Sequence, residues 1–295
     1  MQFAFMNMHL VYKILALSLA LIVLALGSSA TSNATGLSIE RRTLDEQIAL
    51  ILNHTDIRIP ENAESPVPTL IMFHGCGGLR DVQEDYARAA LESGYGVMIV
   101  DSLSARNIGR FGALSQVCAA LRLWGQERSA DIHAALAIAA NDNRIDADNL
   151  ALIGWSHGGW TVLDALGYSG DNVLPPALSE GDARLPDGVK AAILIYPYCG
   201  FPVRAKGSEL DPAIPVHAIL AEHDLIAPNR DCRHTLQRAR EAGVTVDMEV
   251  WPGITHAFDE PNQPVDPRME YNADAAARAR AHIVNILDQT FTDTG

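Results

Sequence analysis

The sequence lacks a surplus of basic residues. Its 295 residues include 22 lysines and arginines against 36 aspartates and glutamates, which gives a formal net charge of -14 at pH 7. Proteins bind nucleic acids and anionic membranes through a basic face, because these partners carry negative charge. The composition therefore argues against both classes of partner and leaves a small-molecule substrate open.

Closely spaced cysteine pairs are also missing. The four cysteines are Cys76, Cys118, Cys199 and Cys232, and no two of them have a C-x-x-C spacing. Zinc sites and thioredoxin-like redox sites are typically built on such pairs. We therefore expect no metal and no redox cofactor at these positions.

The N-terminal region has no apolar run of the ~20 residues that a bilayer span needs. Its apolar run covers residues 14–26, follows a lysine and precedes several small residues, and no acidic residue occurs before Glu40. This is the pattern of a secretory signal. We expect residues 1–30 to be a signal peptide, cleaved after Ala30 or Ala34, on a protein exported to the periplasm or secreted. A retained anchor is the alternative, and membrane contact would then be confined to this segment.

Behind this segment, residues 36–292 alternate between apolar runs of strand length and helical patterns, with no internal repeat and no second core. Such alternation is typical of a doubly wound, mainly parallel sheet with helices on both faces, so we expect one α/β domain. Residues 39–59 suit one or two opening strands, and residues 171–186 suit a surface insertion. Further strands are expected over residues 67–73, 96–100, 150–153, 191–195, 216–220 and 244–251, and helices over residues 83–93, 127–140, 230–242 and 269–287.

A single serine stands between a buried strand and a helix. Residues 154–158 are Gly-Trp-Ser-His-Gly, after the apolar run 150–153 and before the helical pattern that resumes at Thr161. G-x-S-x-G in this context is the pattern of a nucleophile elbow, where strained dihedral angles lift the serine hydroxyl clear of the sheet. A glycine-rich turn with a chance serine is the alternative. Ser156 is therefore the candidate nucleophile.

An acid and a histidine follow two later strands. Ligands of open parallel sheets gather beyond the carboxyl ends of the strands. Asp224 comes after the strand over residues 216–220, and His256 comes after the strand over residues 244–251. The order Ser156, Asp224, His256 is that of the α/β-hydrolase triad, in which the histidine takes the serine proton and the carboxylate orients the histidine. We therefore expect the α/β-hydrolase fold.

Neighbouring residues offer alternatives for both partners. Glu222 or Asp231 can replace Asp224 as the acid, and His223 can replace His256 as the base. Asp224 has the best register with its strand end, whereas His223 lies beside the acid rather than on a separate loop. We therefore expect Asp224 and His256.

A tetrahedral intermediate also needs preset donors for its oxyanion, and backbone N–H groups supply them. The N–H of His157 is one candidate, because this residue follows the nucleophile. The other is an N–H in the glycine turn at residues 75–77, which we assign to Cys76.

Three residues are candidates for the substrate pocket. Trp155 and Tyr196 lie next to the elbow and to the end of a strand, with ordinary core packing as the alternative. Arg106, with Arg110 behind it, is a candidate partner of a substrate carboxylate, with an ion-paired or solvated arginine as the alternative.

Export changes the expected state of the cysteines. In an oxidising compartment four thiols can form two disulfides, and three pairings are possible. Cys199 and Cys232 both fall at the carboxyl edge of the sheet, so we predict that they are bonded. Cys76 and Cys118, near the ends of earlier elements, are the second predicted pair, and four buried thiols are the alternative.

Six short motifs follow one another in the order of one known family. They are His74-Gly75-Cys76-Gly77-Gly78, Asp101-Ser102-Leu103 with Arg106, Gly154-Trp155-Ser156-His157-Gly158-Gly159, Tyr196-Pro197-Tyr198-Cys199, Asp224 with Pro228 and Cys232, and His256-Ala257-Phe258. Over roughly residues 60–290 the chain resembles the dienelactone hydrolase family of α/β-hydrolases. The resemblance implies a single-domain fold without a large lid, the triad Ser156, Asp224 and His256, and hydrolysis of small esters or lactones without a cofactor.

The chain departs from this family at the nucleophile. The enzymes that name the family use a cysteine, whereas this chain has Ser156, so it resembles a serine branch and dienelactone is not the expected substrate. A serine hydrolase of small carboxylic esters or lactones, acting through an acyl-enzyme, is the leading hypothesis. A serine peptidase on the same fold is the alternative, although such peptidases usually carry an extra gating domain. A binding protein that keeps the scaffold without turnover is a third hypothesis, which the three triad residue types argue against.

Overall fold

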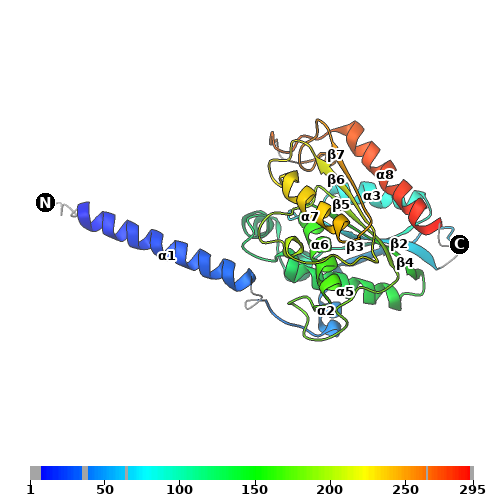
Figure 1. The fold of residues 1–295 in the computed structure, drawn as a ribbon, viewed down its shortest axis with the longest axis horizontal. Helices are drawn as coiled ribbons and strands as arrows, with labels where there is room; N and C mark the ends of the chain where they lie inside the picture. Colours follow the sequence, from blue (N-terminus) through cyan, green and yellow to red (C-terminus); the bar gives the residue numbers. More distant parts are fainter. Residues whose placement is uncertain (1–7, 35–38, 64–65, 264, 293–295) are drawn as a thin grey trace. The chain divides into compact units, whose positions relative to one another are not determined.

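The structure is a computed structural model that describes residues 8–34, 39–63, 66–263 and 265–292. The chain divides into two compact units, Met1–Glu40 and Arg41–Gly295. The described residues of the first unit include the helix α1 (Met8–Ala34), drawn in blue in Figure 1. In the described residues, no helix combines the length and the apolar character that a membrane crossing requires. Most of the expected signal segment falls in α1, and its residues 1–7 lie outside the described residues.

The second unit is built on a seven-stranded sheet in the order β1-β3-β2-β4-β5-β6-β7. All neighbouring strands are parallel except β1 and β3, which are antiparallel. The mainly parallel sheet predicted from the apolar runs is therefore confirmed. Its strands are β1 (Thr55–Arg58), β2 (Val67–Phe73), β3 (Gly96–Val100), β4 (Ile145–Trp155), β5 (Val189–Ile195), β6 (Val216–Ala221) and β7 (Val246–Trp251).

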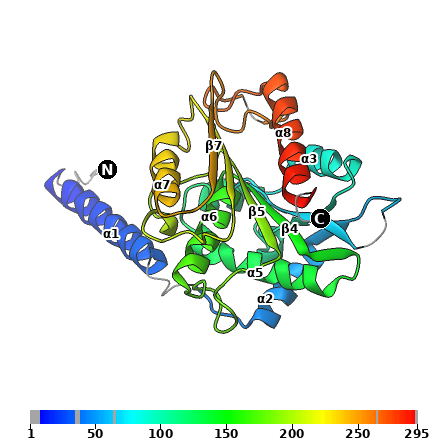
Figure 2. The ribbon, with the colours of Figure 1, turned by 45° about the vertical axis from the view of Figure 1, so that its right-hand side comes forward.

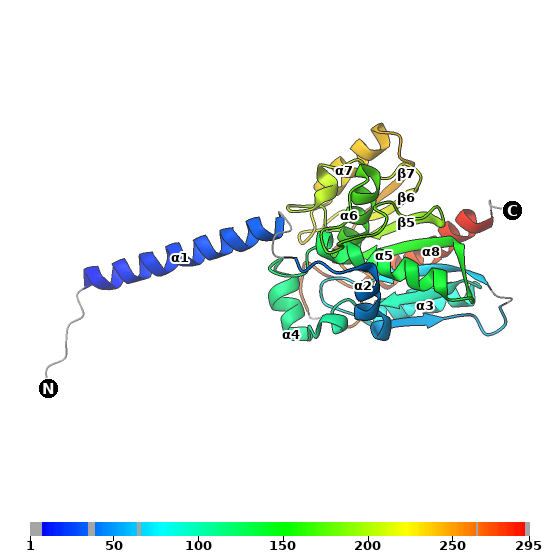
Figure 3. The same ribbon diagram turned by 90° about the horizontal axis from the view of Figure 1, so that it is seen from below.

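Helices cover both faces of this sheet (Figure 2). Side chains of a strand alternate between its two faces, so Leu152 packs into the core cluster on one face and Ile153 into the cluster on the other. α3 and α8 contribute to the Ile153 cluster, whereas α5, α6 and α7 contribute to the Leu152 cluster, with α2 beside α5 (Figure 3). The helices are α2 (Leu44–Ile51), α3 (Asp81–Glu92), the short α4 (Arg110–Gly112), α5 (Gly125–Asn141), α6 (His157–Asp171), α7 (Asn229–Glu241) and α8 (Ala273–Thr292).

The opening segment was predicted correctly only in part. Residues 39–59 contain the helix α2 before the single strand β1, instead of one or two strands alone. A capping box starts this helix, because the Thr43 side chain accepts from the Glu46 N–H while the Glu46 side chain accepts from the Thr43 N–H. An apolar run as short as residues 48–52 does not distinguish a strand from a buried helix turn, and here the caps decide.

The expected surface insertion at residues 171–186 is only partly on the surface. Ala177 and Leu178 are buried. The backbone of Arg42 holds this segment, since its N–H donates to the Ala177 carbonyl and its own carbonyl accepts from Ser179. The segment therefore ties the start of the second unit to its core.

Candidate active site

Ser156 occupies the sharp turn between β4 and α6. Its φ of 50° and ψ of -109° lie in a region that non-glycine residues rarely adopt. The turn requires a close approach of the new helix to strand β2, because a Cβ on Gly158 would lie 1.9 Å from the carbonyl oxygen of Phe73. The G-x-S-x-G residues thus have the geometry of a nucleophile elbow.

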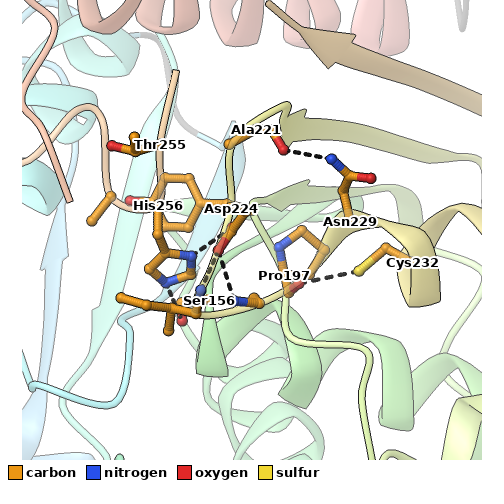
Figure 4. A network of polar contacts seen from close by, with 12 residues as sticks. Ser156, Pro197, Ala221, Asp224, Asn229, Cys232, Thr255 and His256 are labelled. Carbon is orange, nitrogen blue, oxygen red and sulfur yellow. Dashed lines mark hydrogen bonds and ion pairs between the residues drawn. The ribbon is translucent and has the colours of Figure 1, made fainter. Parts of the chain in front are cut away.

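The side chains of Ser156, His256 and Asp224 form a hydrogen-bonded chain (Figure 4). Ser156 Oγ lies 2.9 Å from His256 Nε2, and His256 Nδ1 lies 2.7 Å from Asp224 Oδ2. The carboxylate can only accept, so Nδ1 donates to it and Nε2 is left to accept the serine proton. The other carboxylate oxygen accepts from the N–H groups of Ile226 at 3.0 Å and Ala227 at 2.7 Å, which orients Asp224.

Parallel strands bring these three residues to one edge of the sheet. β4 ends just before Ser156. β6 ends just before the acid loop (residues 222–228), which carries Asp224, and β7 ends just before the histidine loop (residues 252–258), which carries His256. The acid loop is tied to the histidine loop, because the Glu222 N–H donates to the Trp251 carbonyl and the His223 N–H donates to the Ile254 carbonyl. Asn229 holds the other end of the acid loop by donating to the Ala221 carbonyl at 2.8 Å (Figure 4).

The alternative acids and base have other contacts. The Glu222 carboxylate accepts from the Gly253 N–H at 2.9 Å, and Asp231 lies 3.7 Å from Lys206. The His223 side chain is 63% exposed and faces Glu222. None of these groups has a contact with Ser156 among the described residues.

The glycine turn after β2 lies beside the nucleophile. A Cβ on Gly75 would stand 3.7 Å from the Cβ of Ser156, and Cys76 lines the same cavity as the serine. His157 is the first residue of α6, where backbone N–H groups have no partner within the helix. Cys76 and His157 therefore flank the serine from two segments, which is the arrangement that two oxyanion donors require.

A cavity of about 360 Å³ opens at Ser156 and His256. Trp155 and Tyr196 line it, as expected for pocket residues. An ion pair also lines it, in which Arg80 Nε lies 2.5 Å from the Glu260 carboxylate. The remaining lining residues are Gly75, Cys76, Gly77, Gly78, Val82, Gln83, Arg110, Leu114, Cys118, Ile226, Ala257, Gln263, Arg268 and Met269.

Arg106 is not among the lining residues, which corrects its assignment to the substrate pocket. Its guanidinium forms two hydrogen bonds to Asp131, at 2.9 Å and 3.0 Å, and a third to the Ser102 carbonyl at 3.0 Å. Asp131 lies on α5. The sequence of the loop that carries Arg106 does not show which face of α5 turns toward it, so this ion pair could not be predicted. Arg110 lines the cavity instead.

A buried acid near the histidine was missed in the sequence. Asp259 is fully buried and accepts from the Tyr196 hydroxyl at 2.6 Å and from the Tyr86 hydroxyl at 2.7 Å. Burial raises the pKa of Asp259 despite these hydrogen bonds. The Tyr196 ring lies 4.8 Å from the His256 ring, so Asp259 holds the tyrosine that packs on the candidate base. In the sequence, only the position of Asp259 three residues after His256 indicated that it lies near the candidate base.

Two disulfides join the four cysteines, Cys76 to Cys118 and Cys199 to Cys232. These are the two pairs expected from the sequence. The first pair ties the glycine turn to the segment after α4, and both of its cysteines line the cavity. The second is buried, with Cys232 Sγ 3.1 Å from the Pro197 carbonyl oxygen (Figure 4). In the described part of the chain, no group of three or more His, Cys, Asp or Glu side chains is placed to hold a metal ion.

Two family models match parts of the chain. Residues 177–291 match the dienelactone hydrolase family, and residues 92–172 match the prolyl oligopeptidase family. No curated protein matches the sequence.

Solved structures of hydrolases are similar in fold. A Klebsiella pneumoniae protein named for dienelactone hydrolase is 17% identical, with a TM-score of 0.62 over 80% of this chain and 92% of that one. Esterase 2 of Thermogutta terrifontis is 14% identical, with a TM-score of 0.55 over 82% of this chain and 88% of that one. A puromycin-hydrolysing peptidase of Mycobacterium tuberculosis is 17% identical, with a TM-score of 0.54 over 80% of this chain and 37% of that one.

These findings agree with the six motifs read from the sequence. The sheet and its structural neighbours establish the α/β-hydrolase fold. The match over residues 177–291 supports the resemblance to the family that the motifs indicate. The chain has the α/β-hydrolase fold and, over residues 177–291, resembles the dienelactone hydrolase family.

Proposed function

We propose that this protein is an exported serine hydrolase that cleaves small carboxylic esters or lactones through an acyl-enzyme on Ser156. The observation that carries the proposal is the chain of two short contacts, 2.9 Å from Ser156 Oγ to His256 Nε2 and 2.7 Å from His256 Nδ1 to Asp224. A serine hydroxyl is too weakly acidic to attack an ester unaided, so a base within hydrogen-bond distance is the essential requirement.

The mechanism assigns one role to each group. His256 Nε2 takes the hydroxyl proton as Ser156 Oγ bonds to the carbonyl carbon, and Asp224 stabilises the imidazolium that forms. The backbone N–H groups of His157 and Cys76 stabilise the oxyanion. His256 returns the proton to the leaving alkoxide, and the acyl-enzyme remains on Ser156. A water molecule then repeats these steps and releases the acid.

The cavity supports a small substrate. Its volume of about 360 Å³ is at the low end of the range for small-molecule sites. Trp155, Leu114 and Ile226 offer apolar surface, while the Arg80–Glu260 pair supplies a polar part of the wall. An ester with a compact acyl group fits this volume and offers both apolar and polar atoms to the wall.

Export is part of the proposal. The apolar segment before Gly27 has the pattern of a secretory signal, and disulfides persist in oxidising compartments. Two disulfides in the catalytic unit therefore fit a periplasmic or secreted enzyme.

A serine peptidase is the second candidate, because residues 92–172 match the prolyl oligopeptidase family. The structural match to the mycobacterial peptidase covers little more than a third of that protein. The dienelactone hydrolase match covers residues 177–291, which include Asp224 and His256, so ester hydrolysis is the better-supported activity.

A fluorophosphonate probe followed by a substrate panel tests the proposal. We expect the probe to label Ser156, since it reacts with activated serines. We expect turnover of p-nitrophenyl esters to be highest for short acyl chains, with little turnover of aminoacyl amides. Absence of labelling would favour the hypothesis of a binding protein without turnover. Faster turnover of the amides than of the esters would favour a peptidase.

A further inference from the structure

Arg128 is an arginine buried without an acidic partner. It lies near the start of α5, and its side chain is fully buried. Burial lowers the pKa of its guanidinium to about 10, even though Asp131 and Asp101 raise it. Among the described residues, no carboxylate lies within ion-pairing distance of it. A buried cation without a paired anion is costly, so its polar contacts identify what it does.

Those contacts lead to the two segments that flank the nucleophile. Nη1 donates to the His74 carbonyl at 2.7 Å and lies 3.2 Å from Nδ1 of the His157 ring. Nε donates to the Ser102 hydroxyl at 2.8 Å, which sets the plane of the guanidinium. One nitrogen therefore contacts both the start of the glycine turn and the start of α6.

The contact with His157 fixes the state of that ring. Arginine N–H groups only donate, so His157 Nδ1 accepts and the ring proton is on Nε2. Burial, followed by the charge of Arg128, lowers the pKa of His157 well below its ordinary value, so the ring is neutral. Through Nδ1, this neutral ring ties the first residue of α6 to Arg128.

The backbone has little room to move where the glycine turn meets the start of α6. A Cβ on Gly158 would fall within 2.8 Å of the His74 carbonyl oxygen, which is the acceptor that Arg128 holds. The glycine turn and the helix start thus meet at backbone contact distance. A shift of the His74 carbonyl moves the next peptide groups, including the N–H of Cys76.

We propose that Arg128 is a positioning residue that sets the separation of the two oxyanion donors, the backbone N–H groups of Cys76 and His157. It does so by holding the His74 carbonyl and the His157 ring through one guanidinium nitrogen. This inference rests on the proposed function. Arg106, the other buried arginine of this region, has a different role, because its hydrogen bonds go to Asp131 and the Ser102 carbonyl.

The variant Arg128→Met tests this role. Misplacing an oxyanion donor weakens binding of the transition state only, so kcat for a p-nitrophenyl ester is expected to fall on the order of 100-fold while KM changes less than about threefold. A boronic acid, which forms a tetrahedral adduct with the serine, is expected to lose affinity by a similar factor. The ether analogue of the ester has no carbonyl and is expected to bind unchanged.

Arg238→Met is the matched control. Arg238 also binds backbone carbonyls, those of Ala205, Lys206 and Ser208, and none of these residues lines the cavity. Its kcat is expected to stay within about threefold of wild type, with any loss appearing in thermal stability. An equal loss of kcat in both variants would overturn the inference, as would an unchanged kcat in folded Arg128→Met.

Ser102→Ala carries the test if Arg128→Met does not fold. It removes the acceptor of Arg128 Nε together with the Ser102 hydrogen bond to Asp131, and kcat is expected to fall by about three- to tenfold with KM unchanged. An unchanged kcat in this variant would overturn the inference. Labelling and ester turnover by the wild-type protein report on the proposed function separately, since the wild-type protein retains Arg128.

Discussion

At the scale of single residues, the proposed catalysis depends on a hydroxyl held in a strained turn and on a histidine that is almost fully buried. The positive φ of Ser156 is maintained by the packing of α6 on β2 rather than by any preference of serine. His256 is 4% exposed, and its imidazole has one partner on each side, Asp224 and Ser156.

Ser156→Ala and His256→Ala are expected to lose ester turnover to a similar degree. Triad members act as a unit, so each variant should lower kcat by at least ~10⁴-fold. Steady-state kinetics on a p-nitrophenyl ester measure the loss. His223→Ala is the control, because the His223 ring is exposed and should be dispensable. A much milder loss in His256→Ala than in His223→Ala would move the base to His223.

Asp164 is expected to make the stability of the fold depend on pH. Burial raises the pKa of this carboxyl from 3.8 to about 7, although the Ala205 N–H and the Trp160 indole donate to it. The folded state therefore holds a proton that the unfolded chain releases, so the contribution of Asp164 to stability is greatest below pH ~4 and is lost as the pH rises to ~7.

Asp164→Asn removes this titration. The unfolding free energy of wild type relative to Asp164→Asn is expected to fall by about 4 kcal/mol between pH 4 and pH 8, which is the value of a pKa rise from 3.8 to about 7. Urea unfolding at several pH values measures the difference. Parallel pH profiles for the two proteins would contradict the prediction.

At the scale of secondary-structure elements, the contact of α6 with β2 is the tightest constraint on the elbow. Gly158→Ala places a Cβ 1.9 Å from the Phe73 carbonyl oxygen, where only backbone could move away. We expect a loss of roughly 3 kcal/mol or more in unfolding free energy, since rigid overpacking is not relieved by side-chain rotation. Gly207→Ala meets only the Arg204 carbonyl at 3.8 Å and should change stability by less than about 0.5 kcal/mol. Urea titrations compare them, and equal stability of the two variants would refute the clash.

The two disulfides are expected to differ in their access to reductant. Cys118 is exposed and Cys76 lines the cavity, whereas Cys199 and Cys232 are buried. Increasing concentrations of dithiothreitol should therefore reduce the Cys76–Cys118 bond first. Alkylation and peptide mapping at each concentration identify the freed thiols. Earlier alkylation of Cys199 and Cys232 would contradict the order, and four free thiols in untreated exported protein would exclude both bonds.

At the scale of the whole molecule, the N-terminal segment and the catalytic unit form separate compact units. We expect export to remove the segment, because small residues at Ala30 and Ala34 suit signal cleavage. N-terminal sequencing of the exported protein should then begin at Thr31 or Thr35. An intact segment on membrane-bound protein would instead indicate a retained anchor.

Much of the fold could be predicted because its signals are local. A strand of a parallel sheet is buried on both faces, so runs such as residues 150–153 and 216–220 are apolar throughout and easily recognised. The start of α2 was missed because its signal is the pairing of Thr43 with Glu46, which the apolar pattern of the segment obscured. The correctly predicted strands and the missed helix α2 therefore have the same cause, because both predictions were based on local runs of apolar residues.

The candidate site could be located because loops after neighbouring parallel strands must meet at one edge. That rule predicts that Ser156, Asp224 and His256 lie together, and the structure brings their side chains into contact. Their roles in catalysis remain our proposal. The rule does not extend to Arg106, whose position on a loop suggested a substrate contact that the rotation of α5 and Asp131 precludes.

By itself, the sequence determined the order of elements, the elbow and the edge of the sheet where chemistry is possible, because each follows from residues adjacent in the chain or from the period of their burial. Only the tertiary structure decided which distant side chains share a proton or a charge. Asp259 beneath Tyr196 and Arg128 between His74 and His157 are of this kind. Such contacts depend on which face each helix turns toward the sheet. A shift of one residue along a helix changes the direction of the side chain by about 100°.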